Sequence, residues 1–336
     1  MEGRKIDVEI AVCDLCERDN ANIISECHDM QHIVNGTFQV AYCGNCGHYF
    51  LKKRPISEDI GLCYPENYYS YSMSSSIKSK INLKKLIKNK IRSNRLLSEL
   101  ALQFYFTKRL AIDEPFINDI DEWIPIGNVL DIGCGDGAFL DLMKQANWNT
   151  FGLEPNQKAA NIAKKKGHII FQQRADANFD ATFYTNQFHI IYMSHVLEHT
   201  HSPTRTLMEL SKVLEPSGKI IIEVPNMESL STILFEEFSP CYDIPRHLHF
   251  FTPETIKKYM DKCGLQIISL RCFTNPIQFT RAIDILVKNY HSYYFRNKAK
   301  SLLSNLEIIK SFSGLAEFAD QIGYPGTIRL VAERSQ

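Results

Sequence analysis

The segment Val129–Leu140, with the sequence VLDIGCGDGAFL, constrains the fold of this chain more than any other stretch. It opens with an apolar run of the length of a buried strand, Val129 to Ile132. Three alternating glycines follow, and apolar residues then recur at helical spacing. Glycine allows a tight turn and a close approach of the backbone to a ligand, which a Cβ would prevent. This order of strand, glycine turn and helix predicts a nucleotide-binding βα unit.

Each of the first two predicted strands ends near an acidic side chain. Asp131 lies just before the first glycine, and Glu154 follows a second predicted strand at Thr150–Leu153. An acidic residue at the end of the second strand is placed to accept both hydroxyls of a ribose. The alternative interpretation is a tight turn in a Rossmann-like fold that binds no metabolite.

These features resemble the class I S-adenosylmethionine-dependent methyltransferases. The resemblance implies an α/β fold with a Rossmann-like, doubly wound, seven-stranded sheet, and S-adenosylmethionine as the cofactor. Asp176 lies where that family often has an acidic or polar residue near the adenine amino group. The cofactor-binding residues that the resemblance implies are Asp131, Gly133, Cys134, Gly135, Glu154, Asp176 and Ser194.

Two C-x-x-C pairs near the N-terminus predict a second kind of site, with Cys13, Cys16, Cys43 and Cys46 as its ligands. Each pair fits a tight turn, and two such turns complete a tetrahedral zinc site. Alternating apolar residues at Phe38–Tyr42 indicate a strand between the pairs. We therefore predict a zinc ribbon in residues 1–60, whose metal is structural because four cysteines leave no open position.

Other readings of this cysteine-rich region stay open. Cys27, His28 and His32 lie nearby as alternative ligands, and the four thiols could also remain reduced without a metal. A segment this small buries little apolar surface, so a bound metal would supply its folding energy.

Residues 61–122 are predicted to form an aromatic linker and basic amphipathic helices. The tyrosines of Tyr64–Tyr71 either line a substrate pocket or pack between the ribbon and the main domain. Ile77–Leu97 carries eight lysines and arginines and no acidic residue, with apolar positions at helical spacing. Such a helix either buries one face on the main domain or contacts phosphates of a nucleotide-linked sugar, a membrane surface or RNA.

Residues 123–273 and 326–336 are predicted to form the methyltransferase domain. Short apolar runs alternate there with helical patterns, which indicates a parallel sheet. The stretch Leu214–Gly218, LEPSG, has the composition of a turn. Residues 274–325 precede the last strand and are predicted to be a helical insertion, either a substrate lid or a contact between the subunits of a homodimer.

Histidine titrates near neutral pH, so histidines at the predicted ligand-binding edge are candidates for a catalytic base. Ser194–His199, SHVLEH, follows the fourth predicted strand at its carboxyl edge, where ligands bind in open α/β sheets. A similar stretch in quinone O-methyltransferases has a glutamate in place of His195, and its acidic and histidine residues are implicated in binding a divalent metal. We predict catalytic roles for His247, His199 and His195, the first two being favoured.

The segment Asp243–Phe251, DIPRHLHFF, carries further candidates in the loop after the fifth strand. Arg246 is a predicted contact for an anionic group, and His249 is an alternative base to His247. Local capping and packing are the competing explanation for these histidines.

The formal net charge of zero, with 44% hydrophobic and 23% charged residues, is ordinary for a globular protein and makes a nucleic-acid partner unlikely. No apolar run approaches the roughly 18 residues of a membrane span. The ten cysteines, without a signal-peptide pattern, suit a reducing cytoplasm.

The ribbon, the tyrosine-rich stretch, the cofactor domain and RHLHFFTPE together resemble bacterial methyltransferases of sugar and cell-surface glycan biosynthesis. This resemblance implies O- or C-methylation of a small molecule, a nucleotide-linked or glycan sugar. The alternatives are an RNA methyltransferase with a zinc ribbon and a non-catalytic binding protein of the same fold.

Overall fold

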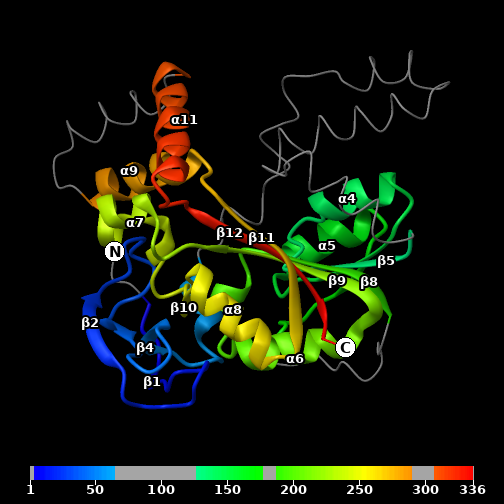
Figure 1. Ribbon diagram of the computed structural model, residues 1–336, viewed down its shortest axis with the longest axis horizontal. Coiled ribbons are helices and arrows are strands. Elements are labelled where there is room, and N and C mark those ends of the chain that lie inside the picture. The colour runs from blue at the N-terminus through cyan, green and yellow to red at the C-terminus, as the bar shows by residue number, and fades with distance from the viewer. Residues whose placement is uncertain (1–3, 65–125, 177–186, 290–305, 336) are drawn as a thin grey trace.

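The computed structural model describes residues 4–64, 126–176, 187–289 and 306–335 (Figure 1). The basic segment Ile77–Leu97 and all of the aromatic stretch after Tyr64 lie outside the described residues. Within the described ranges, no helix combines the length and apolar character needed to cross a membrane.

A seven-stranded sheet forms the larger part of the molecule, in the order β11-β12-β9-β8-β5-β6-β7. Its strands are β5 (Asn128–Ile132), β6 (Asn149–Leu153), β7 (Ile169–Phe171), β8 (Phe188–Ser194), β9 (Leu214–Pro225), β11 (Leu265–Phe273) and β12 (Thr327–Arg334). β5 to β9 are parallel to one another, and β12 runs antiparallel to both β9 and β11. The predicted Rossmann-like, seven-stranded fold is confirmed.

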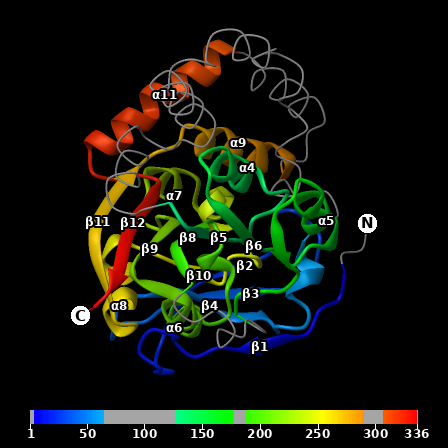
Figure 2. The same ribbon diagram turned by 90° about the vertical axis from the view of Figure 1, so that its right-hand side faces the viewer.

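Helices cover both faces of this sheet (Figure 2). They are α4 (Ala138–Gln145), α5 (Gln157–Lys165), α6 (Pro203–Val213) and α8 (Pro253–Lys262). Successive strand residues point to opposite faces. Val129 therefore packs in the cluster that contains α4, whereas its neighbour Leu130 packs in the cluster that contains α6 and α8.

The start of β9 differs from the sequence prediction. Leu214–Gly218 was expected to be a turn, but the structure includes it in the strand, where Leu214 pairs with Phe188 of β8. A Cβ on Gly218 would lie 2.9 Å from the Phe188 carbonyl oxygen. The prediction was wrong because turn-type composition does not reveal that a neighbouring strand lies this close.

The insertion before β12 is helical, as predicted. Its described helices are α9 (Ile277–Asn289) and α11 (Leu306–Gln321), which lie above the sheet in Figure 1. Phe279 of α9 stacks on Phe312 of α11 and also contacts Phe235 at the end of α7 (Leu230–Phe235).

The N-terminal residues form a smaller antiparallel sheet in the order β1-β4-β3-β2. Its strands are β1 (Val8–Ile10), β2 (Asn22–Cys27), β3 (Phe38–Tyr42) and β4 (Tyr49–Pro55), followed by the short helix η1 (Ile60–Cys63). β10 (His249–Phe250), which comes from the methyltransferase part of the chain, pairs with β4. The segment that follows β9 is therefore joined to the smaller sheet by main-chain hydrogen bonds.

The first cysteine turn also contacts the larger domain. Asp14 accepts hydrogen bonds from the Ser202 hydroxyl at 2.5 Å and the Thr204 amide at 2.9 Å, at the N-terminus of α6. A carboxylate is favourable there because the first amides of a helix have no partner within the helix. Lys262 of α8 donates to the carbonyl oxygens of Asp14 and Leu15.

The four predicted cysteine ligands come together. Their sulfur atoms all lie within 4.8 Å of one another, with 3.5 Å between Cys13 and Cys46 and 3.5 Å between Cys16 and Cys43. Tetrahedral zinc with Zn–S bonds of about 2.3 Å separates its sulfur ligands by about 3.8 Å. Burial raises the pKa of Cys46 to about 11, so a bound cation is needed to keep this thiolate ionised at neutral pH. The cluster is compatible with zinc.

With zinc in this cluster, Cys13→Ser is expected to lose stoichiometric zinc and to be destabilised by at least about 3 kcal/mol, because a bound metal would supply folding energy to the small sheet. Metal analysis and denaturant unfolding on one sample measure both effects. Cys272→Ser is the matched control, since Cys272 lies on β11, outside the cluster. Full zinc content in Cys13→Ser would contradict the metal assignment.

Candidate functional site

The glycine turn lies between the carboxyl ends of β5 and β6. The amides of Gly133 and Cys134 both donate to the Leu153 carbonyl oxygen, at 2.8 and 3.0 Å. Gly133 has φ +72°, and a Cβ there would lie 2.6 Å from the Val196 side chain. Glycine is therefore required at this position by both the backbone conformation and the space.

Two buried carboxylates flank the turn, Asp131 at 5% and Glu154 at 4% exposure. Glu154 accepts hydrogen bonds from the amides of Gly135 at 2.9 Å and Asn156 at 2.7 Å. Burial raises the pKa of Glu154, and burial together with the Glu154 charge raises the pKa of Asp131.

The two buried carboxyl groups of Asp131 and Glu154 fit S-adenosylmethionine as a ligand. Each carboxylate oxygen has two acceptor positions, so Glu154 can accept ribose hydroxyls while it keeps both amide bonds. A ligand with positive charge would stabilise the ionised forms of these two neighbouring buried carboxyl groups, and S-adenosylmethionine carries a sulfonium and an ammonium group.

Ser194 and Cys134 lie near this edge in different surroundings. Ser194, the last residue of β8, donates to Glu223 at 2.9 Å, and Arg329 pairs with the same carboxylate at 2.5 Å. Cys134 is buried, and a Cβ on Gly152 would lie 2.5 Å from its sulfur. The Cys134 side chain thus packs against β6.

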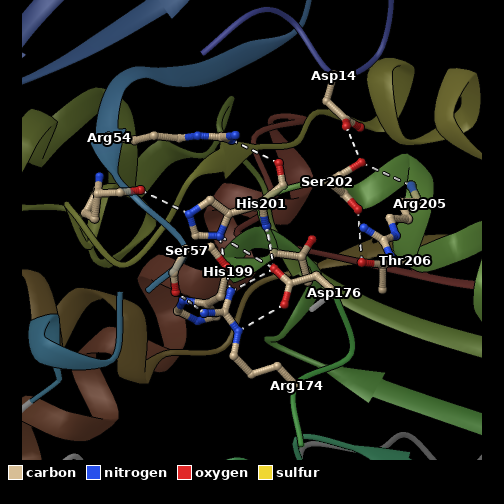
Figure 3. A network of polar contacts seen from close by, with 12 residues as sticks. Asp14, Arg54, Ser57, Arg174, Asp176, His199, His201, Ser202, Arg205 and Thr206 are labelled. Carbon is tan, nitrogen blue, oxygen red and sulfur yellow. Dashed lines mark hydrogen bonds and ion pairs between the residues drawn. The ribbon is translucent and has the colours of Figure 1, made fainter. Parts of the chain in front are cut away.

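Asp176 lies in a polar network that reaches the smaller sheet (Figure 3). Arg174 donates to both of its oxygens, at 3.0 and 2.9 Å, and the His201 amide donates at 2.7 Å. Arg174 also donates to the Ser57 carbonyl oxygen. Burial opposes ionisation of Asp176, but His201 and Arg174 outweigh burial and lower its pKa. Both oxygens are therefore engaged by the protein, and contact with adenine stays a prediction.

The short helix η4 (Leu197–His199) brings three of the histidine candidates around one carboxylate. Glu198 is 1% exposed, and its Oε1 lies 3.3 Å from Nδ1 of His195 and 4.0 Å from Nε2 of His247. The His199 and His247 rings meet edge to face, with centroids 4.6 Å apart.

Backbone carbonyls fix the proton position on two of these rings. Nδ1 of His199 lies 2.9 Å from the Arg246 carbonyl oxygen, and Nδ1 of His247 lies 2.7 Å from that of Cys241. Because a carbonyl oxygen only accepts, each Nδ1 carries a proton, and in the neutral form of each ring the lone pair is on Nε2. The Tyr64 hydroxyl lies 3.1 Å from Nδ1 of His199, so one residue of the tyrosine-rich stretch reaches the site.

Several acceptors thus converge beside the cofactor edge. Ligand atoms of Glu198, His199 and His247 lie within 4.8 Å of one another, and Glu198 Oε2 has no hydrogen-bond partner among the described residues. Such a group can take a proton from a substrate or hold a divalent cation.

The electrostatics separate the three histidines. Burial and the neighbouring His247 lower the pKa of His199 to about 4, so this ring is neutral at physiological pH. Burial lowers the pKa of His195, but Glu198 more than reverses this and the net shift is upward. Burial raises the pKa of Glu198, but the three histidines around it lower this pKa by more than burial raises it. Glu198 is therefore an anion.

Two expectations for the loop after β9 were wrong. Arg246 is not exposed to an anionic ligand, because its guanidinium is buried and pairs with Asp29 and Asp243. His249 does not join the cluster of Glu198, His199 and His247, since its Nδ1 lies 3.0 Å from Nε2 of His48 beside the smaller sheet. Asp29 and His48, which contact Arg246 and His249, are remote in sequence. The i, i+3 spacing of Asp243 and Arg246 was the one local signal of an ion pair.

Known proteins are similar to this chain in sequence. A family model described as a methyltransferase domain matches residues 91–270. A ubiquinone biosynthesis O-methyltransferase of Azoarcus sp. (strain BH72) is 27% identical over 168 residues, which are 46% of this chain and 72% of that protein. An uncharacterized protein of Methanocaldococcus jannaschii is 28% identical over 186 residues, 54% of this chain and 78% of that protein.

A solved structure of a SAM-dependent methyltransferase from Archaeoglobus fulgidus covers 75% of this chain and 99% of its own, with 21% identity and a TM-score of 0.43. The sheet order, the glycine turn and the acid after β6 define a Rossmann-like enzyme of the S-adenosylmethionine-dependent class. Because the family model matches more than half of the chain, this protein belongs to the methyltransferase-domain family. It is an S-adenosylmethionine-dependent methyltransferase.

We expect Glu154→Gln to weaken S-adenosylhomocysteine binding between about 10- and 100-fold. The side-chain NH₂ of glutamine would face one of the two backbone N–H groups from which the carboxylate now accepts a hydrogen bond. Titration calorimetry measures the affinity. Glu254→Gln is the control, since Glu254 is exposed on α8, where it pairs with Lys258 of the same helix. Equal affinities in the two variants would refute the ribose assignment.

The low pKa of His199 predicts a pH-dependent contribution to stability. The unfolded chain binds a proton at His199 near pH 6.5, whereas the folded protein binds it only near pH 4. Stability is therefore lost as the pH falls through this window. From about pH 7 to about pH 5, the wild type should lose between about 1 and 2 kcal/mol more than His199→Gln. Urea unfolding at both pH values measures this, and parallel losses in the two proteins would contradict it.

Proposed function

We propose that this enzyme transfers the methyl group of S-adenosylmethionine to a hydroxyl group of a small acceptor, with His247 as the general base. The observation that carries this proposal is the placement of His247 Nε2 at 4.0 Å from the buried Glu198 carboxylate. This distance exceeds a hydrogen bond, so the contact leaves the lone pair available for a substrate proton.

The residues divide the work as follows. The acceptor oxygen attacks the methyl carbon, the bond from carbon to sulfur breaks, and its electron pair stays on sulfur. His247 Nε2 takes the hydroxyl proton, and Glu198 stabilises the imidazolium that forms, while the Cys241 carbonyl keeps the ring oriented. His195, at the exposed side of Glu198, can pass the proton to solvent. His199 is neutral and orients the base through ring contact.

For the acceptor class we propose a nucleotide-linked or glycan sugar. This choice is supported by the four-cysteine sheet and the RHLHFFTPE segment, which resemble features of sugar methyltransferases. If the acceptor atom is carbon, the same base would remove the proton from that carbon. We also propose zinc as the metal of the four-cysteine cluster, since its sulfur geometry suits that ion.

A phenolic acceptor is the second candidate, because several relatives are named ubiquinone biosynthesis O-methyltransferase. In this alternative a divalent cation at Glu198, His199 and His247 would lower the pKa of the acceptor hydroxyl.

Methyl transfer to three acceptor classes tests the proposal. We would incubate the zinc-loaded protein with S-adenosylmethionine and nucleotide-linked sugars, a catechol or RNA, with and without Mg²⁺, and follow S-adenosylhomocysteine release and product mass. Methylation of a sugar without Mg²⁺ supports the proposal. Methylation of the catechol alone, and only with Mg²⁺, supports the second candidate, whereas methylation of RNA overturns both.

With the acceptor so identified, we expect His247→Gln to lower kcat at least about 100-fold while the affinity for S-adenosylhomocysteine stays within about twofold, because only the proton acceptor is lost. His189→Gln serves as control, since His189 lies at the opposite end of β8. If His247→Gln keeps wild-type kcat, another group is the base.

A further inference from the structure

We propose that Asp29 of the smaller sheet is a positioning residue for the methyl-transfer site, acting through Arg246 on His199 and His247. The expected effect on kcat rests on the proposed function, whereas the expected effect on the His199 tautomer does not. Asp29 lies more than two hundred residues before His247 in the chain, in the loop between β2 and β3.

Arg246 is the link between the two parts of the molecule. Its guanidinium is completely buried and donates to Asp29 at 2.9 Å, to Asp243 at 2.7 Å and to the Cys63 carbonyl oxygen at 2.9 Å. A buried arginine is costly unless such partners surround it, so its position is set by theirs.

Asp29 is itself held rigidly. One of its oxygens accepts the amides of Ile33 and Val34, at 2.8 and 3.1 Å, and the other accepts the amide of Gln31 at 3.0 Å. Gln31 in turn donates to Asp243 at 2.7 Å. The carboxylate thus fixes the β2–β3 loop and the guanidinium at the same time.

The backbone of Arg246 transmits this position to the histidines. Its carbonyl oxygen accepts the Nδ1 proton of His199, which selects the tautomer with a lone pair on Nε2. His247 follows directly in the chain, and the next amide, that of Leu248, donates to the Glu198 carbonyl oxygen at 2.7 Å. A shift of Arg246 therefore moves the base, the neighbouring ring and the contact to the Glu198 main chain together.

Asp29→Asn tests this arrangement with a minimal change. The amide oxygen can keep the bonds from Ile33 and Val34, which directs the NH₂ group toward the Arg246 guanidinium, where two donors repel. Arg246 keeps Asp243 as its counter-ion, so no unpaired buried charge arises and the fold is retained. Asp29→Ser is the second variant, since a hydroxyl is too short to reach Arg246.

Nitrogen NMR of the imidazole rings reports the tautomer of each histidine. We expect His199 to change from the Nδ1–H form to a mixture with Nε2–H in Asp29→Asn, with zinc content and S-adenosylhomocysteine affinity unchanged. With the acceptor, kcat should fall between about 10- and 100-fold while KM stays within about threefold, because an ångström of displacement at a base is costly.

Asp19→Asn is the matched control, because Asp19 is an exposed acid of the same sheet that pairs with Lys52. It should leave the tautomer and kcat as in the wild type. An unchanged His199 tautomer in a folded, zinc-loaded Asp29→Asn or Asp29→Ser protein would overturn the proposal. A changed tautomer without any methyl transfer in the wild type would retain the link to His199 and reject the proposed acceptor chemistry instead.

Discussion

The pairing of β10 with β4 is the interaction on which the arrangement of this molecule depends. It registers His249 with Phe50 and Phe250 with Tyr49, and thereby fixes the loop after β9 against the smaller sheet. A main-chain ladder cannot slip by one residue without turning every side chain to the other face. The pairing therefore decides that Arg246 reaches Asp29 and that His247 faces Glu198.

The same junction joins apolar surfaces into one core. Phe50 and the buried zinc-ligand candidates Cys13, Cys43 and Cys46 pack in a cluster with Phe251, Tyr259 and residues of the large sheet and α6. On another side, Arg174 connects the loop after β7 to the Ser57 carbonyl oxygen. The cysteine-rich sheet and the residues after it thus contact both the loop after β7, which carries Asp176, and the loop after β9, which carries His247. A structural change in this sheet would therefore displace residues of both loops.

The sequence contained enough information for the parts whose signals are local. The first strand, the glycine turn and the acid after the second strand all lie between Val129 and Glu154, and the spacing of each cysteine pair is set by one turn. The contacts of Arg246 with Asp29 and of His249 with His48 could not be predicted, because each pair is about two hundred residues apart in the chain. Glu198 was recognised within a motif, yet its position at the centre of three histidines required the loop after β9 to be placed.

The long separation between β4 and β10 also has a consequence for how the chain acquires its structure during synthesis. All four clustered cysteines precede Gly47, so the cysteine cluster can form early, whereas the strand that completes the small sheet is made about two hundred residues later. Until then the Tyr49–Phe50 end of β4 has an open edge, and open edges recruit strands from other chains. The yield of correctly folded enzyme should therefore depend on how soon residues 249–250 are synthesised. Until they are, the open edge of β4 can cause the growing chain to aggregate.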